Sequence, residues 1–296
     1  MRVGIIANQR AGAPGSMRIL GHVERFARSW ATEVHTVVPR PDDRIERVSA
    51  ELARTVDLIM VVGGDGTLNG VVNGIMHAGT HTPIAFVPAG RGKDVARTLG
   101  GIRWADLQRR SATWKHRAVD VGFVATDEGS GRYFLNASTS GLGARSARVA
   151  SRLPRLPGTT CYLLGAGVGL MQDRPYTARL CLDGREIVLH ECRLVVVANC
   201  RFLGGGLRFA PDAAVDDGLL DVVGVAGIGR VEILNAIPRV FRGTHLTHHA
   251  VQSWRAAEIT IRADIPVEVE TDGELIGTTP VTYSVARKAL TWAVLA

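Results

Sequence analysis

The sequence predicts an α/β plus all-β chain, with a Rossmann-like N-terminal domain built on a parallel sheet and a C-terminal antiparallel β-sandwich domain. Two observations lead to this fold class. Through the first hundred residues, short apolar segments alternate with segments of helical periodicity. Beyond about residue 115, strand-like runs are separated by glycine-containing turns. The first pattern is typical of strands joined by crossover helices, and the second of β-hairpins.

The parallel part rests on four expected strands. They read RVGIIAN, EVHTVV, DLIMVVG and TPIAFVPA. All four are short, rich in β-branched residues and almost continuously apolar, as strands buried on both faces are. Between them, SMRILGHVERFARSWA and DDRIERVSAELAR carry apolar residues at intervals of three and four, which indicates helices. We therefore expect residues 1–115 to form a nucleotide-binding α/β domain.

The second part contains the hairpin signals D-G, G-S-G and D-D-G. Two helical segments interrupt its strands, at about 142–172 and 229–243. Residues 116–287 are therefore expected to form the β-sandwich domain. The last strand, at about 288–296, is a candidate to return to the first domain.

Composition restricts the function classes. The 296-residue chain is 46% hydrophobic and 21% charged, which is typical of a globular protein. Its net charge of +7 favours anionic partners, but it has no recognised nucleic-acid-binding motif and only 5% aromatic residues, so nucleic acid is not expected. The four cysteines show no C-x-x-C pair, which suits a reducing, cytoplasmic compartment. The longest uncharged stretch is too short for a membrane span, so we expect a soluble protein or one peripheral to the inner membrane face.

The segment VVGGDGTLNG, residues 61–70, places three glycines around Asp65 between an expected strand and an expected helix. Glycine-rich turns at helix N-termini bind phosphate, because backbone N–H groups and the helix dipole favour anions. A carboxylate in such a loop makes sense if Mg²⁺ lies between it and a polyphosphate. A tight turn in which Asp65 caps the helix is the structural alternative.

The longer pattern GGDGTLN-x-V-x-NG resembles the signature of the diacylglycerol kinase catalytic-domain family of lipid kinases, which includes sphingosine kinases. NAD kinases share only GGDGT. The resemblance continues through PAGRGKD at residues 88–94, VDVGFV, FLNAS, and VANCRFLGGGLRFAPDAAVDDGLLDVV. It ends at TDGE, whose last residue is Glu274. The DDGLLD and TDGE segments separate this family from NAD kinases.

This resemblance implies an ATP- and Mg²⁺-dependent kinase that phosphorylates an alcohol hydroxyl, most simply that of a lipid such as diacylglycerol, in a cleft between the two domains. Asp65, Asp94 and Asp120 would hold Mg²⁺ through water, and Glu274 would accept the hydroxyl proton. The implied nucleotide contacts are Gly63, Gly64, Asp65, Gly66, Thr67, Leu68, Asn69, Arg91 and Lys93. A second, structural Mg²⁺ is implied at Ala214, Asp217 and Leu219.

Plainer roles exist for several of these residues. Asp94 could be a helix N-cap, Asp217 an ordinary turn residue, and Glu274 a solvated strand residue. Taken singly, these structural readings would be preferred. The occurrence of the motifs in order over most of the chain favours the kinase.

The sequence departs from the family on the nucleotide side. It has Gly70 where relatives usually have glutamate, and Arg91 and Lys93 where they usually have threonine and asparagine. These changes remove an anion and add two cations near the expected phosphate site. Three hypotheses follow: a lipid kinase with a cationic phosphate clamp, a kinase for a soluble alcohol, or a family member that binds nucleotide without catalysis.

A basic segment raises the question of membrane contact. Arg145, Arg148, Arg152 and Arg155 precede the apolar stretch TTCYLLGAGVGLM. Such a helix could rest on an anionic leaflet, or it could be a solvated face beside a core helix. The sequence leaves both open, and it also leaves a homodimer open.

Overall fold

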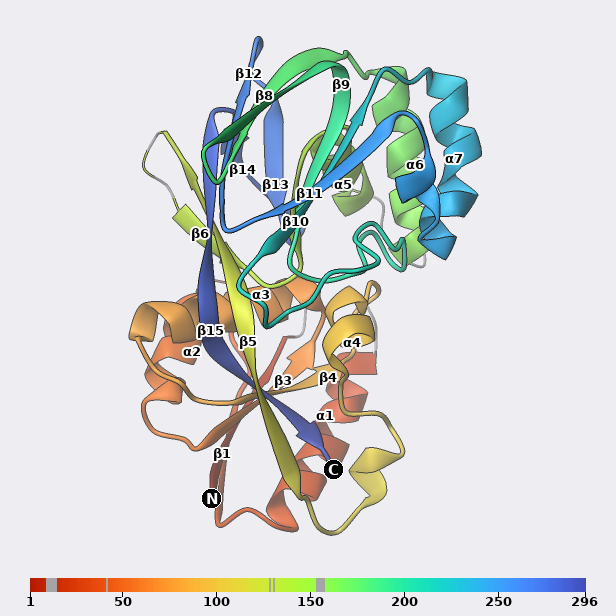
Figure 1. Ribbon diagram of the computed structural model, residues 1–296. Helices are drawn as coiled ribbons and strands as arrows, with labels where there is room; N and C mark the ends of the chain where they lie inside the picture. The colour runs from red at the N-terminus through yellow and green to blue at the C-terminus, as the bar shows by residue number, and fades with distance from the viewer. Residues whose placement is uncertain (9–14, 41, 128, 130, 153–157) are drawn as a thin grey trace. The chain divides into compact units, whose positions relative to one another are not determined.

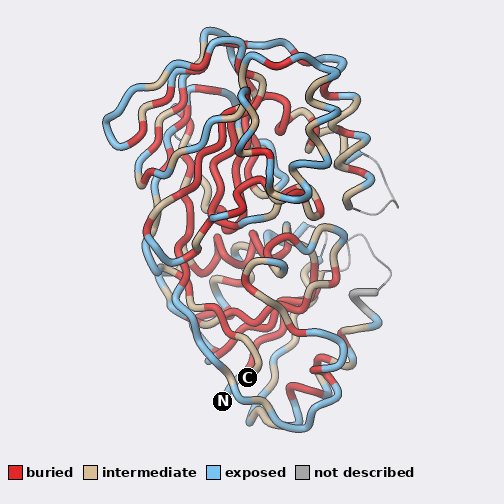
Figure 2. Tube along the Cα trace, turned by 45° about the vertical axis from the view of Figure 1, so that its right-hand side comes forward, coloured by how far each residue is buried: buried red, intermediate tan, exposed pale blue. Residues whose placement is uncertain are grey.

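The computed structural model describes residues 1–8, 15–40, 42–127, 129, 131–152 and 158–296. The chain forms two compact units (Figure 1). The first consists of Met1–Val119 and Lys288–Ala296, and the second of Asp120–Arg287. The chain therefore crosses from one unit to the other twice, after Val119 and after Arg287. In each unit the buried chain runs through the middle, and the exposed chain lies at the periphery (Figure 2).

The first unit is built on a parallel sheet. Its strands are β1 (Arg2–Ala7), β2 (Glu33–Val37), β3 (Leu58–Gly63) and β4 (Ile84–Pro88), in the order β4-β3-β1-β2. The end of β15 (Val281–Leu295) pairs with β4 in the same direction, with Trp292 opposite Ile84. The helical elements are α1 (Gly15–Arg28), α2 (Ile45–Ala53), α3 (Asp65–Ala78), α4 (Asp94–Leu99) and η1 (Asp106–Gln108). The predicted Rossmann-like arrangement is confirmed.

Helices α2 and α3 pack closely because α3 presents glycines to its neighbour. A methyl group on Gly74 would lie 2.0 Å from the Ser49 hydroxyl oxygen, and one on Gly70 would lie 3.0 Å from a methyl carbon of Ile45. The Glu46 carboxylate oxygen is 3.8 Å from that same point beside Gly70. The hypothesis that Gly70 simply removes an anion therefore needs correction. The small residue permits close helix packing, and another carboxylate lies at the same place.

The second unit is antiparallel, as predicted. Its elements are β5 (Trp114–Thr126), which begins in the first unit, β6 (Gly131–Phe134), β7 (Ala137–Gly141), α5 (Leu142–Ser151), α6 (Gly158–Met171), β8 (Tyr176–Leu182), β9 (Arg185–Ala198), β10 (Leu220–Ala226), α7 (Arg230–Arg242), η2 (His245–Thr247), β11 (Val251–Ala256), β12 (Glu258–Ala263), β13 (Glu268–Thr271) and β14 (Glu274–Thr278). The strands follow the order β14-β13-β7-β9-β8-β12-β15. In addition, β10 pairs with β9, and β11 pairs with β10. The expected D-G turns join β8 to β9 and β13 to β14, with positive φ at all four turn residues.

Strand β9 organises the two layers of this unit. Its first part pairs with β8, and Leu194–Ala198 lies between β7 and β10. Val195 and Val197 belong to the core between the strands, whereas Leu194, Val196 and Ala198 pack in a second core with α5–α7. Both faces are therefore covered, and the helices form a separate layer on one of them (Figure 1). Among the described residues, no helix is long and apolar enough to cross a membrane.

Candidate functional site

Two glycine loops of the first unit are joined directly to each other. The carbonyl oxygen of Gly63, at the end of β3, accepts hydrogen bonds from the N–H groups of Ala89 (2.8 Å) and Gly90 (3.1 Å), which follow β4. A methyl group on Gly90 would lie only 2.3 Å from the Cα atom of Gly64. Glycine is therefore required at residue 90 by backbone contact. The two loops form one surface beyond the carboxyl ends of β3 and β4, where open α/β sheets bind ligands.

Asp65 connects these loops through its carboxylate. The backbone N–H groups of Lys93, Asp94 and Val95, at the start of α4, donate to it. Its Oδ1 atom is buried and has no hydrogen-bond partner among the described residues. Burial raises the pKa of this carboxyl group, and the three N–H donors and the Arg97 guanidinium act in the opposite direction. The sequence offered a choice between a cap and an ion ligand. The structure shows a cap, although for α4 rather than α3, with one oxygen left over.

The second loop carries three cations. Arg91 and Lys93 are exposed, and Lys93 adopts a left-handed conformation with φ of 61° as the N-cap of α4. Arg97 was not singled out from the sequence. Its Nη1 atom donates to the Asp94 Oδ1 atom at 2.8 Å and to the Gly92 carbonyl oxygen. The Asp94–Arg97 spacing of three residues at the start of a helix is the signal that could have identified this pair.

The remainder of the GGDGTLN segment supports the loop from inside. Thr67, Leu68 and Asn69 are buried. The Thr67 hydroxyl accepts a hydrogen bond from the Asn8 side chain at 3.1 Å, and the Asn73 side chain donates to Asn69. The part of this segment that faces solvent is therefore Gly64 to Gly66. The second glycine loop, which Asp65 holds, also faces solvent.

Asp120 is fully buried in the second unit and holds the DDGLLD loop. Its N–H group donates to the Val215 carbonyl oxygen (2.6 Å), and its Oδ2 atom accepts from the Gly218 N–H group (2.7 Å). The side chain of Asn199 donates to the carbonyl oxygens of both Asp120 and Leu135 at 2.9 Å. Asp120 is thereby tied to the FLNAS segment.

The carboxylate among the residues implied for a structural Mg²⁺ already has partners within the protein. The Asp217 Oδ2 atom forms an ion pair with Arg255 of β11, and its Oδ1 atom accepts from the Leu219 N–H group at 3.1 Å. Both oxygens of the only carboxylate among Ala214, Asp217 and Leu219 are thus engaged, and the neutralising charge comes from the protein itself. A bound cation would therefore compete with Arg255 for this carboxylate, and a metal at these three residues stays a prediction.

Three hydrogen bonds to Asp272, which we call the Asp272 clamp, hold the β13–β14 hairpin that carries Glu274. The Asp272 carboxylate accepts three backbone N–H groups of the FLNAS segment: those of Leu135 (3.0 Å), Asn136 (3.1 Å) and Ala137 (3.0 Å). Glu274 follows on β14. Its side chain is 54% exposed and forms an ion pair with Arg132 at 3.0 Å. The FLNAS and TDGE segments, matched separately in the sequence, are thus one structural feature.

Glu270 gives this hairpin a predicted pH dependence. It is buried, accepts hydrogen bonds from Thr139 and Gly273 at 2.8 Å each, and burial raises its pKa to about 7. A carboxyl group whose pKa is higher in the folded state favours folding below its unfolded pKa, and this contribution disappears as pH rises through 7. From pH 5 to pH 8 the loss amounts to about 2–3 kcal/mol.

Glu270→Gln should remove this loss because glutamine does not ionise, and its NH₂ group can donate to the Thr139 hydroxyl in place of the bond that Glu270 accepts. Urea unfolding at pH 5 and pH 8 measures it, with Glu186→Gln on the exposed part of β9 as control. An equal fall in stability for wild type and Glu270→Gln would contradict this assignment.

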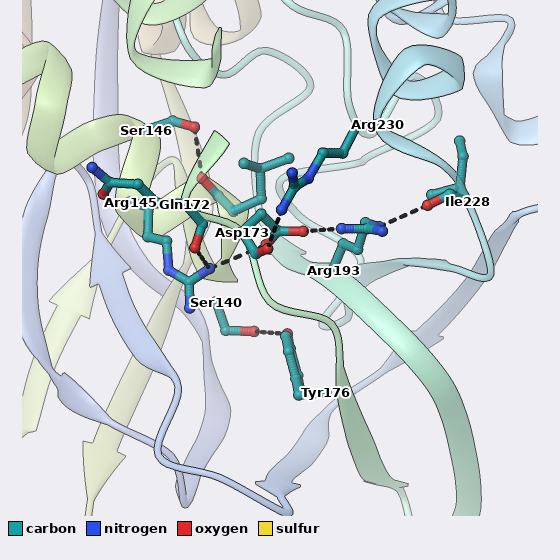
Figure 3. Close-up of polar contacts among 10 residues, drawn as sticks. Ser140, Arg145, Ser146, Gln172, Asp173, Tyr176, Arg193, Ile228 and Arg230 are labelled. Atoms are coloured by element: carbon teal, nitrogen blue, oxygen red, sulfur yellow. Dashed lines mark hydrogen bonds and ion pairs between the residues drawn. The ribbon is translucent and has the colours of Figure 1, made fainter. Parts of the chain in front are cut away.

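A second buried carboxylate, Asp173, joins the helices of this unit. It forms ion pairs with Arg145 of α5 (3.2 Å) and Arg193 of β9. Its carbonyl oxygen accepts from Arg230 of α7 at 3.1 Å, and Figure 3 shows the three arginines around it. Arg145 is therefore largely buried in an ion pair, and the structure gives it a role inside the unit. Arg148 likewise pairs with Glu268, Arg152 is exposed, and Arg155 lies outside the described residues.

Comparison with known proteins gives matches over nearly the whole chain. Residues 2–124 match the diacylglycerol kinase catalytic domain, and residues 136–294 match the YegS C-terminal NAD kinase beta sandwich-like domain. A diacylglycerol kinase of Mycobacterium tuberculosis is 28% identical over 296 residues, covering 98% of this chain and 94% of that protein. One of Bacillus subtilis is 28% identical over 285 residues, covering 94% and 91%.

Solved structures have the same fold. A structure described as a diacylglycerol kinase from Bacillus anthracis str. Sterne superposes with a TM-score of 0.74 at 23% identity. A second structure from that organism superposes with a TM-score of 0.79 at 26% identity, and each comparison covers 98% of this chain and 96% of the other. The two matched domains together show that the chain belongs to the diacylglycerol kinase catalytic-domain family of lipid kinases, and thus that it is a phosphotransferase with an alcohol acceptor.

Proposed function

We propose that the chain transfers the γ-phosphoryl group of ATP, with Mg²⁺, to the hydroxyl group of a lipid such as diacylglycerol. The observation that carries the lipid acceptor is an apolar cavity of the second unit, enclosed by α5, α6, α7 and strands of the sheet. Its apolar lining includes Leu142, Tyr162, Ala166, Leu170, Leu207, Phe209, Ile233, Ile237 and Val240. An acyl chain gains about 0.8 kcal/mol for each methylene group buried there, and a small soluble alcohol gains little.

The helices around this cavity also suit a lipid surface. Helix α6 contains no charged residue and exposes Leu164, Val168 and Met171, which lie four and three residues apart and so share one stripe. Helix α7 exposes Val231, Leu234 and Phe241, has arginines in its last turn, and has no buried residue. Apolar stripes accompanied by arginine favour peripheral contact with an anionic leaflet. We therefore assign the proposed membrane contact to the outer faces of α6 and α7, and not to the arginines of α5.

The first unit supplies the nucleotide end of the proposed reaction. Backbone N–H groups of the two joined loops, with Arg91 and Lys93, would bind phosphate oxygens. The unpartnered Oδ1 atom of Asp65 fits Mg²⁺, directly or through water, because this cation prefers carboxylate and phosphate oxygens. Asp94 and Asp120 would orient the surrounding loops. Bound Mg²⁺ would supply neutralisation of phosphate charge.

Glu274 would act as the general base of the second unit. It would accept the proton of the acceptor hydroxyl while that oxygen attacks the γ-phosphorus atom and ADP leaves. Its exposure leaves it accessible to a substrate, and the Asp272 clamp fixes the strand from which it projects. Phosphoryl transfer requires alignment and charge neutralisation more than covalent help. The Asp272 clamp would contribute to alignment, and the cations of the first unit would contribute to neutralisation.

The direct test is transfer from γ-labelled ATP to diacylglycerol in mixed micelles and to a panel of water-soluble alcohols. We expect labelled lipid and no labelled soluble product. Transfer only to soluble alcohols would refute the lipid acceptor. Nucleotide binding without transfer to either panel would leave a non-catalytic binding protein.

Narrowing the cavity should weaken use of long acyl chains. Ala166→Phe adds an aromatic ring to the lining and excludes a few methylene groups, so kcat/KM for a long-chain diacylglycerol should fall about 30-fold, which corresponds to about 2 kcal/mol. The KM for ATP should not change. Steady-state kinetics with acceptors of increasing chain length measures both.

Val168→Phe is the control because it also introduces phenylalanine on α6, but on the exposed side. It should not raise the KM for the lipid. Equal losses for the two variants, or none for Ala166→Phe, would show that the cavity does not receive the acceptor.

A further inference from the structure

Three potential metal ligands converge in the second unit, beside the apolar cavity that His248 also lines. Glu232 lies in the first turn of α7, and His248 and His249 follow η2. One ligand atom from each lies within 4.8 Å of the others. The Oε1 atom of Glu232 is 3.4 Å from the Nε2 atom of His248 and 3.5 Å from that of His249.

These distances suit a shared ion better than hydrogen bonds. An N–H···O hydrogen bond usually measures about 2.7–3.2 Å between its heavy atoms. Ligands bound tetrahedrally to Zn²⁺ at about 2.0–2.1 Å lie about 3.3–3.4 Å from one another. The chain contains an internal comparison, since the ordinary pair of His35 and Glu33 has an Nε2–Oε1 distance of 2.9 Å.

The surroundings leave the three groups available. The rings of His248 and His249 stack with centroids 4.5 Å apart, which holds them side by side. In the described part of the chain, Glu232 forms ion pairs only with these two rings. The His248 side chain is 12% exposed and that of His249 71%, so the group is anchored on one side and open to an entering ion and a water ligand on the other.

We propose that Glu232, His248 and His249 form a site for a divalent transition-metal ion of the Zn²⁺ type. Two imidazoles and one carboxylate suit such ions, whereas Mg²⁺ and Ca²⁺ prefer oxygen ligands alone. Coordination through Nε2 places the His248 ring proton on Nδ1, so Nδ1 would no longer accept the long 3.3 Å contact from the Ala250 N–H group. Because His248 and α7 both line the apolar cavity, a bound ion would fasten α7 beside it.

The experiment uses the full chain without a histidine tag, freed of metal with EDTA and dialysed. Calorimetric titration with ZnCl₂ should show one ion bound per chain, and MgCl₂ should show none at this site. Glu232→Gln and His249→Asn should each lower Zn²⁺ affinity at least tenfold. Both positions are partly or largely exposed, so circular dichroism should show an unchanged fold.

His35→Asn, which breaks the comparison pair in the first unit, should leave Zn²⁺ affinity within twofold of the wild type. Zn²⁺ should also raise the thermal unfolding temperature of the wild type and not that of Glu232→Gln. The proposal is overturned if the wild type binds no Zn²⁺, or if both variants bind it as tightly as the wild type. These measurements need no ATP or lipid, so they are independent of the proposed kinase reaction.

Discussion

Glu274→Gln is expected to lower kcat for phosphoryl transfer about 10²- to 10⁴-fold, the range that a positioned general base contributes. The reason is chemical, since the amide has nearly the shape of the carboxylate but cannot take the hydroxyl proton. The side chain is largely exposed on β14, and among the described residues it is bonded only to Arg132. Its replacement should therefore leave the fold intact. Label transfer from ATP and thermal unfolding measure the two effects separately.

Glu258→Gln is a suitable control because it changes another exposed strand carboxylate of the same unit, on β12. It should retain wild-type kcat. If Glu274→Gln keeps more than a tenth of the wild-type rate with diacylglycerol, Glu274 is not the base.

Changes at Asp65 should separate charge from structure. Asp65→Asn keeps an oxygen that can accept the N–H groups of Lys93, Asp94 and Val95, but it loses the negative charge at the buried, unpartnered position. Activity should fall about 10²-fold or more, as expected for loss of one electrostatic element of a phosphoryl-transfer site. The Mg²⁺ concentration that gives half-maximal activity should rise.

The stability of two Asp65 variants should move in opposite directions. Burial raises the pKa of Asp65, which means that the folded protein disfavours its charge at neutral pH, so Asp65→Asn should be at least as stable as wild type. Asp65→Ala loses the cap of α4 as well and should be destabilised by about 0.5–2 kcal/mol. Urea unfolding compares them, with Asp42→Asn, at an exposed position of the same unit, as control. Wild-type activity and Mg²⁺ dependence in Asp65→Asn would exclude a metal role for this residue.

The features that sequence predicted are those encoded locally. Continuous apolar runs indicated the parallel strands, and D-G pairs indicated the hairpins of β8–β9 and β13–β14, because strand burial and turn geometry depend on neighbouring residues. The glycine loops were also visible, although the sequence could not show that Gly64 and Gly90 touch. That contact depends on the pairing of β3 with β4.

The features that sequence missed depend on distant partners. Asp217 was assigned to a metal site from the family resemblance, and the sequence could not place its partner Arg255, 38 residues later, beside it. Gly70 was interpreted through charge because its contact with α2 depends on helix packing. Asp173 gave no local signal at all, since its partners Arg145 and Arg193 come from a helix and a strand on either side of it in the chain. Side-chain pairing across elements is a property of the folded chain.

The Asp272 clamp has a consequence for the order in which the protein is made. The N–H groups that donate to Asp272 belong to Leu135, Asn136 and Ala137. These residues precede Asp272 by 135 to 137 positions in the chain. Closing such a long loop costs conformational entropy, and folds rich in distant pairings form slowly. A ribosome has released the whole first glycine loop long before it adds Asp272. The end of β15, which pairs with β4 of the first unit, also follows Asp272 in the chain. We therefore expect a nascent chain to complete both the sheet of its first unit and its candidate base only after these late residues are made, so that partly folded protein has no competent catalytic group.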